Sequence, residues 1–316
     1  MKKFKIAGLI ALILVGILVC QLLIVHIGYT MLDFTDKVTY TDIRTPEEYE
    51  LNAQELDLKT EDNFNIHIYE VLLPDPDGVI IMLTGITGPS VTHFYGPAEL
   101  VASENFASIL IDVRGHGKSD GDKVTCAIDD VKDVQAVVNY INTQERYKDK
   151  PILTMGLSMG GATAINSAAL IDDIDGIIAL AAFSSWTEVN VDCVEFKEWP
   201  RFIGDLMRPG IITYGLLQYG MDYFKIIPEE SIKKIGDKPI FLMHSTDDNQ
   251  IPDKSFHRLV AAYQGNNLTI WNREGWEHFV VRENNISQPR TDPEFCEKIL
   301  DFLQQFKPIA RRVHAI

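Results

Sequence analysis

The 316-residue sequence predicts an α/β fold: a doubly wound, mostly parallel sheet with a helical cap, preceded by one transmembrane helix. Three observations predict it. Short apolar segments alternate with segments of helical periodicity after residue 50, which is typical of parallel sheets covered by helices on both faces. A long segment without a strand pattern follows residue 182, and a continuous apolar run lies near the N-terminus.

The apolar run extends from Ile6 to Ile27. As a helix it rises about 33 Å, enough to cross a hydrocarbon core of about 30 Å. We therefore divide the chain into a basic tail (1–5), a transmembrane anchor (6–28), a stalk (29–50) and a globular domain (51–316). Gln21 and His26 interrupt the run, and we expect them to be tolerated in its outer half without a partner.

Charges on either side of the run predict its orientation. Lys2, Lys3 and Lys5 precede it, whereas Asp33 and Asp36 follow it. By the positive-inside rule, the N-terminus is cytoplasmic and the domain extracytoplasmic, as in a single-pass membrane protein. The alternative is a secreted protein whose signal peptide is removed. Residues 20–32 contain no small-x-small cleavage pattern, so the sequence favours an uncleaved anchor.

Eight β-strands are expected in the domain, several of them continuous apolar runs of the kind found in sheets buried on both faces. They are Glu55–Lys59, Ile66–Leu72, Val79–Leu83, Ala107–Val113, Ile152–Gly156, Gly176–Ala182, Ile240–His244 and Leu268–Trp271. Apolar residues at helical spacing predict helices over 131–141 and 295–306. Asp292-Pro293 supplies a cap residue and an N-terminal proline for the last helix.

A cap insertion is expected at about 184–236, because the connection there is far longer than one crossover helix needs. Residues 184–228 hold eight of the chain's 30 aromatic residues, about twice their share by length. Most of them are expected to pack the cap on the sheet. The aromatic residues that we expect to line a substrate pocket are Trp186, Trp199, Phe202 and Tyr214.

The segment Gly156-Leu157-Ser158-Met159-Gly160 follows an apolar strand and precedes a helix rich in small residues. This is a G-x-S-x-G nucleophile elbow in its required context. Ser158 is the predicted nucleophile, and Gly156 and Gly160 leave room where the backbone is crowded. The backbone N–H of Met159 lies at a helix N-terminus, where it can stabilise an oxyanion.

A serine nucleophile needs a base and an acid that orients it. His278 follows the last strand, and Asp247 and Asp248 both follow the strand before it, which matches the chain order Ser…Asp…His. A second oxyanion donor is expected after the strand 79–83. There the glycine-rich loop contains Gly85, which lets the backbone turn inward, and Ile86, whose N–H is the predicted donor.

Together the elbow, the loop Arg114-Gly115-His116-Gly117-Lys118-Ser119, the segment ending in Ile251-Pro252 and the late histidine resemble the α/β-hydrolase superfamily. Within it, the chain is similar to the serine-aminopeptidase-like and monoacylglycerol-lipase-like group over about residues 50–308. The resemblance implies a cofactor-free hydrolase of esters, thioesters or amides. It also selects Asp248 as the acid, because family members carry it three residues before Val or Ile. Thr84-Gly85 and His244-Ser245 depart from the usual His-Gly pairs, which bears on substrate range.

Composition excludes several other classes. The formal net charge of −16 opposes nucleic-acid binding. The cysteines are Cys20, Cys126, Cys193 and Cys296; they show no CxxC spacing, so no metal site is predicted, and the pairing of the last three stays open. No phosphate-binding pattern follows the Gly-x-Gly of the 112–119 loop, which we expect to brace the site.

The predicted function is hydrolysis of carboxylic esters with a lipid-like or medium-chain acyl group through an acyl-enzyme. Three alternatives remain at this stage. A serine aminopeptidase or amidase would need an acidic group for the substrate ammonium, such as Glu188 or Glu195 in the cap. A thioesterase would use the same triad, and an inactive binding protein would use the same fold. The sequence predicts no particular oligomeric state.

Overall fold

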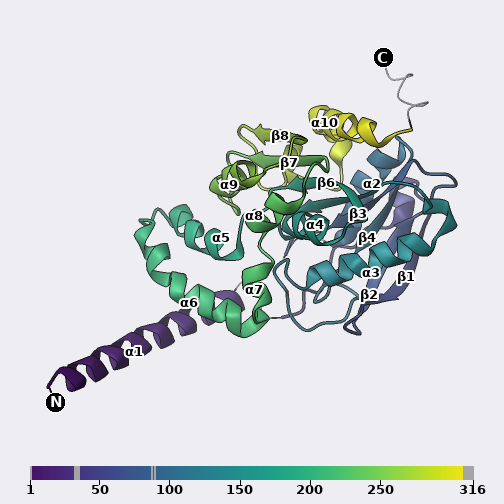
Figure 1. The fold of residues 1–316 in the computed structure, drawn as a ribbon. Helices are drawn as coiled ribbons and strands as arrows, with labels where there is room; N and C mark the ends of the chain where they lie inside the picture. Colours follow the sequence, from purple (N-terminus) through teal and green to yellow (C-terminus); the bar gives the residue numbers. More distant parts are fainter. Residues whose placement is uncertain (1, 32–35, 87, 89, 309–316) are drawn as a thin grey trace.

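The computed structural model describes residues 2–31, 36–86, 88 and 90–308. Its centre is a sheet of eight strands in the order β1-β2-β4-β3-β5-β6-β7-β8 (Figure 1). Only the pairs β1–β2 and β2–β4 are antiparallel, and the other neighbours run parallel. The strands are β1 Ala53–Lys59, β2 Asn65–Val71, β3 Gly78–Leu83, β4 Phe106–Ile111, β5 Ile152–Leu157, β6 Ile174–Leu180, β7 Ile240–Ser245 and β8 Leu268–Arg273.

All eight predicted strands and the doubly wound α/β fold are confirmed. No strand end shifts by more than two residues; β6, for example, was expected to reach residue 182 but ends at Leu180. The reason is local: Ala181 has a positive φ of 47°, which turns the chain out of the sheet at the end of the apolar run.

The sheet separates two apolar cores because successive side chains of a strand point to opposite faces. Ile81 of β3 packs in one core and its neighbour Ile80 in the other. Helices α3 Asp130–Thr143, α4 Met159–Leu170 and α9 Lys254–Ala262 supply the first core, and α2 Tyr95–Ala102 and α10 Pro293–Leu303 the second. Both faces of the central strands β3 to β7 are therefore buried, which accounts for their continuous apolar runs, whereas the edge strand β8 is partly exposed.

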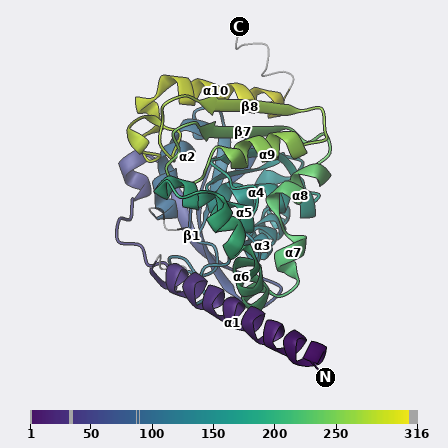
Figure 2. The same cartoon turned by 90° about the vertical axis from the view of Figure 1, so that its left-hand side faces the viewer.

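The cap lies between β6 and β7 and consists mainly of helices α5 Trp186–Asp192, α6 Phe202–Tyr219 and α7 Asp222–Lys225. The short helix α8 Pro228–Ser231 leads back to the sheet and contacts α4. Figure 2 shows α5 in front of the sheet and α6 between the domain and the N-terminal helix.

The N-terminal helix, α1 Lys2–Met31, contains a segment Ile6–Thr30 that is long and apolar enough to cross a membrane. It does not stand alone, because its C-terminal half packs on α6. Gln21 donates from Nε2 to the carbonyl oxygen of Leu206 at 2.7 Å, and His26 Nδ1 lies 3.2 Å from the Tyr214 hydroxyl. The expectation that these two polar residues lack partners is therefore wrong.

The segment predicted as a stalk, 29–50, includes residues 32–35, which lie outside the described residues. Beyond them, Val38 forms a parallel β-bridge with His116, donating its N–H to Gly115 and accepting from the N–H of Gly117. This part of the segment therefore packs on the domain. All four cysteines are free thiols.

Candidate active site

Ser158 lies at the turn between β5 and α4, with a φ of 57° and a ψ of −117°. A non-glycine residue in such a conformation costs about 1–3 kcal/mol, so the surrounding packing must enforce it. The flanking glycines make the turn possible. A Cβ on Gly156 would lie 2.1 Å from the carbonyl oxygen of Gly160, and a Cβ on Gly160 would lie 2.3 Å from the carbonyl oxygen of Leu83. The elbow therefore packs directly against the end of β3.

The loop that follows β3 reaches the predicted nucleophile. A Cβ on Gly85 would lie 3.4 Å from the Cβ of Ser158, so this backbone passes within contact distance of the serine. Ile86, Ser158 and Met159 line one cavity. Met159 is the first residue of α4, where backbone N–H groups have no intrahelical acceptor. The two residues predicted to supply oxyanion donors thus lie on the same cavity wall as the serine.

His116 of the 112–119 loop holds the Ile86 loop in position. Its Nε2 lies 2.9 Å from the Ile86 carbonyl oxygen, and its Nδ1 lies 3.2 Å from the Arg114 carbonyl oxygen. Burial lowers the pKa of His116, so the ring is neutral at neutral pH. These contacts match the bracing role expected for this loop.

His278 and Asp248 form a buried pair. Nδ1 of His278 lies 2.8 Å from Oδ2 and 3.0 Å from Oδ1 of Asp248, and the N–H groups of Gln250 and Ile251 donate to Oδ1 at 2.8 Å. Burial alone would raise the pKa of Asp248, but its hydrogen bond and charge interaction with His278 lower it overall. Asp247 is exposed, so the structure brings only Asp248 to the histidine.

A small cleft joins the serine and the histidine. Its volume is about 130 Å³, and its lining residues are Gly85, Ile86, Gly88, Ser158, Gln250, His278 and Phe279. Ser158 also lines the larger cavity of about 290 Å³ under α5. The serine thus lies between a cleft that contains the histidine and a mostly apolar cavity, an arrangement in which the two halves of an ester can occupy different spaces.

The apolar cavity corrects most of the predicted pocket. Of the four aromatic residues, only Trp186 lines it, together with Phe183, Val189, Asn190, Cys193, Gln250 and Ile251. Trp199 and Phe202 are exposed on the outer side of the cap, and Tyr214 is buried against α1 rather than the cavity. Aromatic enrichment identified the cap but not which side of each helix faces inward, since that depends on how α1 and α6 pack.

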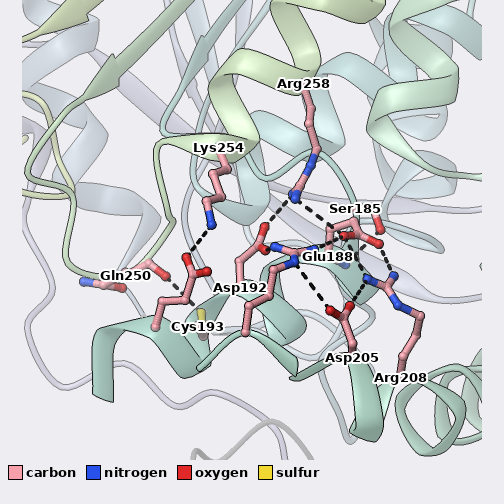
Figure 3. Close-up of polar contacts among 11 residues, drawn as sticks. Ser185, Glu188, Asp192, Cys193, Asp205, Arg208, Gln250, Lys254 and Arg258 are labelled. Atoms are coloured by element: carbon pink, nitrogen blue, oxygen red, sulfur yellow. Dashed lines mark hydrogen bonds and ion pairs between the residues drawn. The ribbon is translucent and has the colours of Figure 1, made fainter. Parts of the chain in front are cut away.

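An ion-pair cluster joins the cap to the domain (Figure 3). Glu188 of α5 pairs with Arg201, Arg208 and Arg258, and the fully buried carboxylate of Asp192 pairs with Arg201 and Arg258. A separate pair connects Glu195 to Lys254. Because Lys254 and Arg258 lie on α9, these contacts hold α5 over the cavity. The sequence offered no signal for them, since the partners lie up to 70 residues apart.

No cluster of three or more potential metal ligands occurs in the part of the chain that the structure describes. The side chains that the geometry gathers around the two cavities are a serine, a histidine and an aspartate.

Comparisons with known proteins agree with this architecture. Residues 74–216 match the family described as serine aminopeptidase, S33. The uncharacterized protein YqkD of Bacillus subtilis (strain 168) is 25% identical over 244 residues, which are 75% of this chain and 77% of that protein.

Solved structures share the fold at low sequence identity. The Pyrococcus furiosus esterase Pf2001 superimposes with a TM-score of 0.67 and 19% identity over 87% of this chain and 98% of its own. The α/β hydrolase GrgF of Penicillium sp. sh18 has a TM-score of 0.60 and 17% identity over 81% of this chain and 99% of its own. The acylaminoacyl peptidase of Pyrococcus horikoshii has a TM-score of 0.60 and 15% identity over 81% of this chain and 42% of its own. The chain therefore has the α/β-hydrolase fold, as the sequence resemblance predicted.

Proposed function

We propose that this chain is a membrane-anchored serine hydrolase that cleaves carboxylic esters with an apolar acyl group through an acyl-enzyme intermediate. The observation that carries the proposal is the position of Ser158, on a strained elbow between the cleft of His278 and the apolar cavity under α5. The family match and the esterase among the solved structures with this fold are consistent with hydrolase chemistry.

In this mechanism, the Ser158 oxygen attacks the ester carbonyl carbon while Nε2 of His278 accepts the hydroxyl proton. The charged Asp248, hydrogen-bonded at Nδ1, stabilises the imidazolium that forms. Backbone N–H groups of Met159 and Ile86 would stabilise the oxyanion. The intermediate then collapses: the C–O bond to the alcohol breaks, and the imidazolium returns its proton to the leaving oxygen. Water, deprotonated by His278, attacks the acyl carbon; the bond to the Ser158 oxygen breaks, the imidazolium returns the proton to that oxygen, and the acid leaves.

Which cavity takes which half of the ester follows from their linings. The cavity under α5 is mostly apolar and lined by residues that include Trp186 and Val189, so it suits the acyl chain. His278 lines the smaller cleft, where the leaving alcohol must receive its proton. A medium-length apolar acyl group with a small alcohol is the substrate class that fits this division.

An aminopeptidase is disfavoured by the state of the cap carboxylates. Recognition of a substrate ammonium needs a carboxylate that is not already neutralised. Glu188 pairs with three arginines and Glu195 pairs with Lys254, so the two residues that the sequence offered for this role are engaged. The acidic side chains therefore hold the cap and leave the substrate site mostly apolar.

The uncleaved anchor is supported by the packing of α1. Gln21, Val25 and Tyr29 are buried against the cap, and cleavage of a signal peptide within or after this region would remove these contacts. We propose a cytoplasmic N-terminus and an extracytoplasmic domain. Intact mass of the membrane-extracted protein should include residues 1–31, whereas a mature N-terminus between residues 20 and 35 would identify a cleaved signal.

Covalent labelling tests the nucleophile. A fluorophosphonate probe should label the parent protein and not Ser158→Ala, whereas Ser167→Ala, a change of a buried serine on the same helix, should keep labelling. Equal labelling of Ser158→Ala and parent would overturn the assignment.

The substrate class is tested with p-nitrophenyl esters of graded acyl length beside aminoacyl-nitroanilides and acyl thioesters. Preference for medium-chain oxygen esters is expected, and preference for either of the other two classes would reassign the activity.

A further inference from the structure

Exposed apolar side chains are concentrated on the cap. Outside α1, the described residues include eleven exposed large apolar side chains, and eight of them lie within residues 196–224. They are Phe196, Trp199, Phe202, Leu206, Leu216, Leu217, Met221 and Phe224. Soluble surfaces expose such residues singly, and a concentration of this kind marks an interaction site.

The exposed apolar residues of α6 share one side of that helix. Phe202, Leu206 and Leu217 are between 62% and 70% exposed, and the exposed Pro209 lies between them at helical spacing. The opposite side of the helix is buried at Gly204, Ile211 and Gly215. The helix is therefore amphipathic, with an apolar stripe that faces away from the protein. Its nearby charge Asp205 is neutralised by Arg201 and Arg208.

Contact with α1 determines what this stripe faces. Gln21 lies about 22 Å along the helix from Ile6. A hydrocarbon core of about 30 Å that begins at Ile6 therefore ends a short distance beyond Gln21. Leu206 accepts the hydrogen bond from Gln21, and a Cβ on Gly210 would lie 2.5 Å from the Cβ of Gln21. Since α6 touches α1 at this height, it lies at the domain-side boundary of any bilayer that α1 crosses.

The residues that line the cavity under α5 are close in the chain to the same surface. Cys193 lines the cavity under α5, and the exposed residues Phe196 and Trp199 follow it within six residues. Trp186, which lines the cavity, contacts Tyr29 of α1 edge-on with ring centroids 6.0 Å apart. The cavity, the cap surface and the anchor are therefore parts of one contiguous structure.

We propose that the outer side of the cap, residues 196–224, lies in the interface of the membrane that α1 crosses, and that substrate enters the cavity under α5 from the lipid phase. An amphipathic helix in an interface buries its apolar side at the boundary between headgroups and acyl chains. The docking does not depend on the chemistry at Ser158, whereas the entry of substrate rests on the proposed hydrolase function. Membrane-borne acyl esters are the substrate class that this arrangement selects.

Docking is tested with the full-length protein in phosphatidylcholine nanodiscs, with or without brominated acyl chains, which quench nearby tryptophan fluorescence. The anchor holds every variant in the disc, so quenching reports the cap. Brominated lipid should quench the parent, and Trp199→Phe should remove that quenchable component, whereas Trp276→Phe, a change after β8, should retain it. Equal quenching of parent and Trp199→Phe, or none in the parent, would overturn docking.

Substrate entry is tested by comparing a soluble butyrate ester with a medium-chain decanoate ester incorporated in the discs. Leu206→Glu should lower hydrolysis of the decanoate about tenfold, because a charged side chain opposes burial of the apolar stripe in the interface, and should leave the butyrate unchanged. Ile270→Glu is the matched control, because Ile270 is also exposed but lies on β8, at the opposite end of the molecule from α1 and α6 in Figures 1 and 2. Equal decanoate hydrolysis by the two variants would overturn the entry route. Failure of the parent on both esters would instead contradict the proposed function, while the quenching still decides docking.

Discussion

Nδ1 of His278 lies 2.8 Å from Oδ2 of Asp248, whereas the adjacent Asp247 is exposed to solvent. We expect Asp248→Asn to reduce kcat by about 10⁴, because the histidine would be left in the wrong tautomer and its charged form without a counter-ion. Asp247→Asn should retain most of the activity on a medium-chain ester. The opposite ranking of the two variants, measured by steady-state kinetics, would reassign the acid to Asp247.

Replacement of a glycine at the elbow should reduce turnover. In Gly160→Ala the new Cβ would lie 2.3 Å from the carbonyl oxygen of Leu83, so the elbow and the loop carrying Ile86 must separate. A displacement near 1 Å at reacting groups costs about 10² in rate, and we expect a loss of that size in kcat. Gly28→Ala is the control for a glycine-to-alanine substitution without a clash, because no atom lies within 4 Å of the new Cβ. Unchanged kcat in Gly160→Ala would mean that the elbow can relax.

Tyr29 connects the N-terminal helix α1 to the cavity under α5. Its ring is buried and contacts Trp186 and Tyr214 edge-on, with ring centroids 6.0 and 5.0 Å apart. Tyr29→Ala should lower the free energy of unfolding by about 3 kcal/mol and reduce kcat/KM for medium-chain esters more than for acetyl esters, because Trp186 loses support. Ile24→Ala, at an exposed position of the same helix, should change neither quantity. Thermal unfolding in detergent and kinetics with both esters measure these effects.

The sequence predicted well what depends on local pattern. The central strands β3 to β7 were found because both faces of the sheet are covered there, so each is an apolar run bounded by turns. The edge strands β1 and β8 are partly exposed and have more mixed sequences. Ser158, Asp248 and His278 were chosen from motifs at strand ends, and the structure brings their segments to the same pair of cavities. The fold carries such loops at one edge of the sheet, so the order of elements already implied this convergence.

The features that could not be predicted from the sequence depend on contacts between distant segments. Trp186 and Phe202 are both aromatic residues of the cap, yet Trp186 lines the cavity and Phe202 is exposed, because contacts with α1 and the ion-pair cluster position α5 and α6. We expected Gln21 and His26 to lack hydrogen-bond partners, because a single helix provides no partner for them. Their partners on α6 lie more than 180 residues away. No spacing rule connects such positions.

Asp130 provides a test of buried charge away from the site. This residue begins α3 and is fully buried, and burial raises the pKa of its carboxyl group to about 6 despite the lowering effects of Thr125 and Arg114. The folded protein therefore keeps a proton on Asp130 at pH values where the unfolded chain, with an ordinary aspartate, has lost it. Between about pH 4 and 6 the folded state binds more protons, so the contribution of this group to stability falls as the pH rises.

Asp130→Asn should remove that dependence, because the amide is neutral throughout. We expect the variant to gain stability relative to the parent as the pH rises from 4 to 7, by on the order of 1–3 kcal/mol, the equivalent of one to two pKa units. Thermal unfolding of both proteins in detergent at pH 4.5 and 7 measures this difference. The control is Asp129→Asn, a change of the adjacent carboxylate, which is partly exposed and pairs with Lys132. A stability difference between Asp130→Asn and parent that stays constant with pH would show that Asp130 is already ionised in the folded protein at pH 4.5.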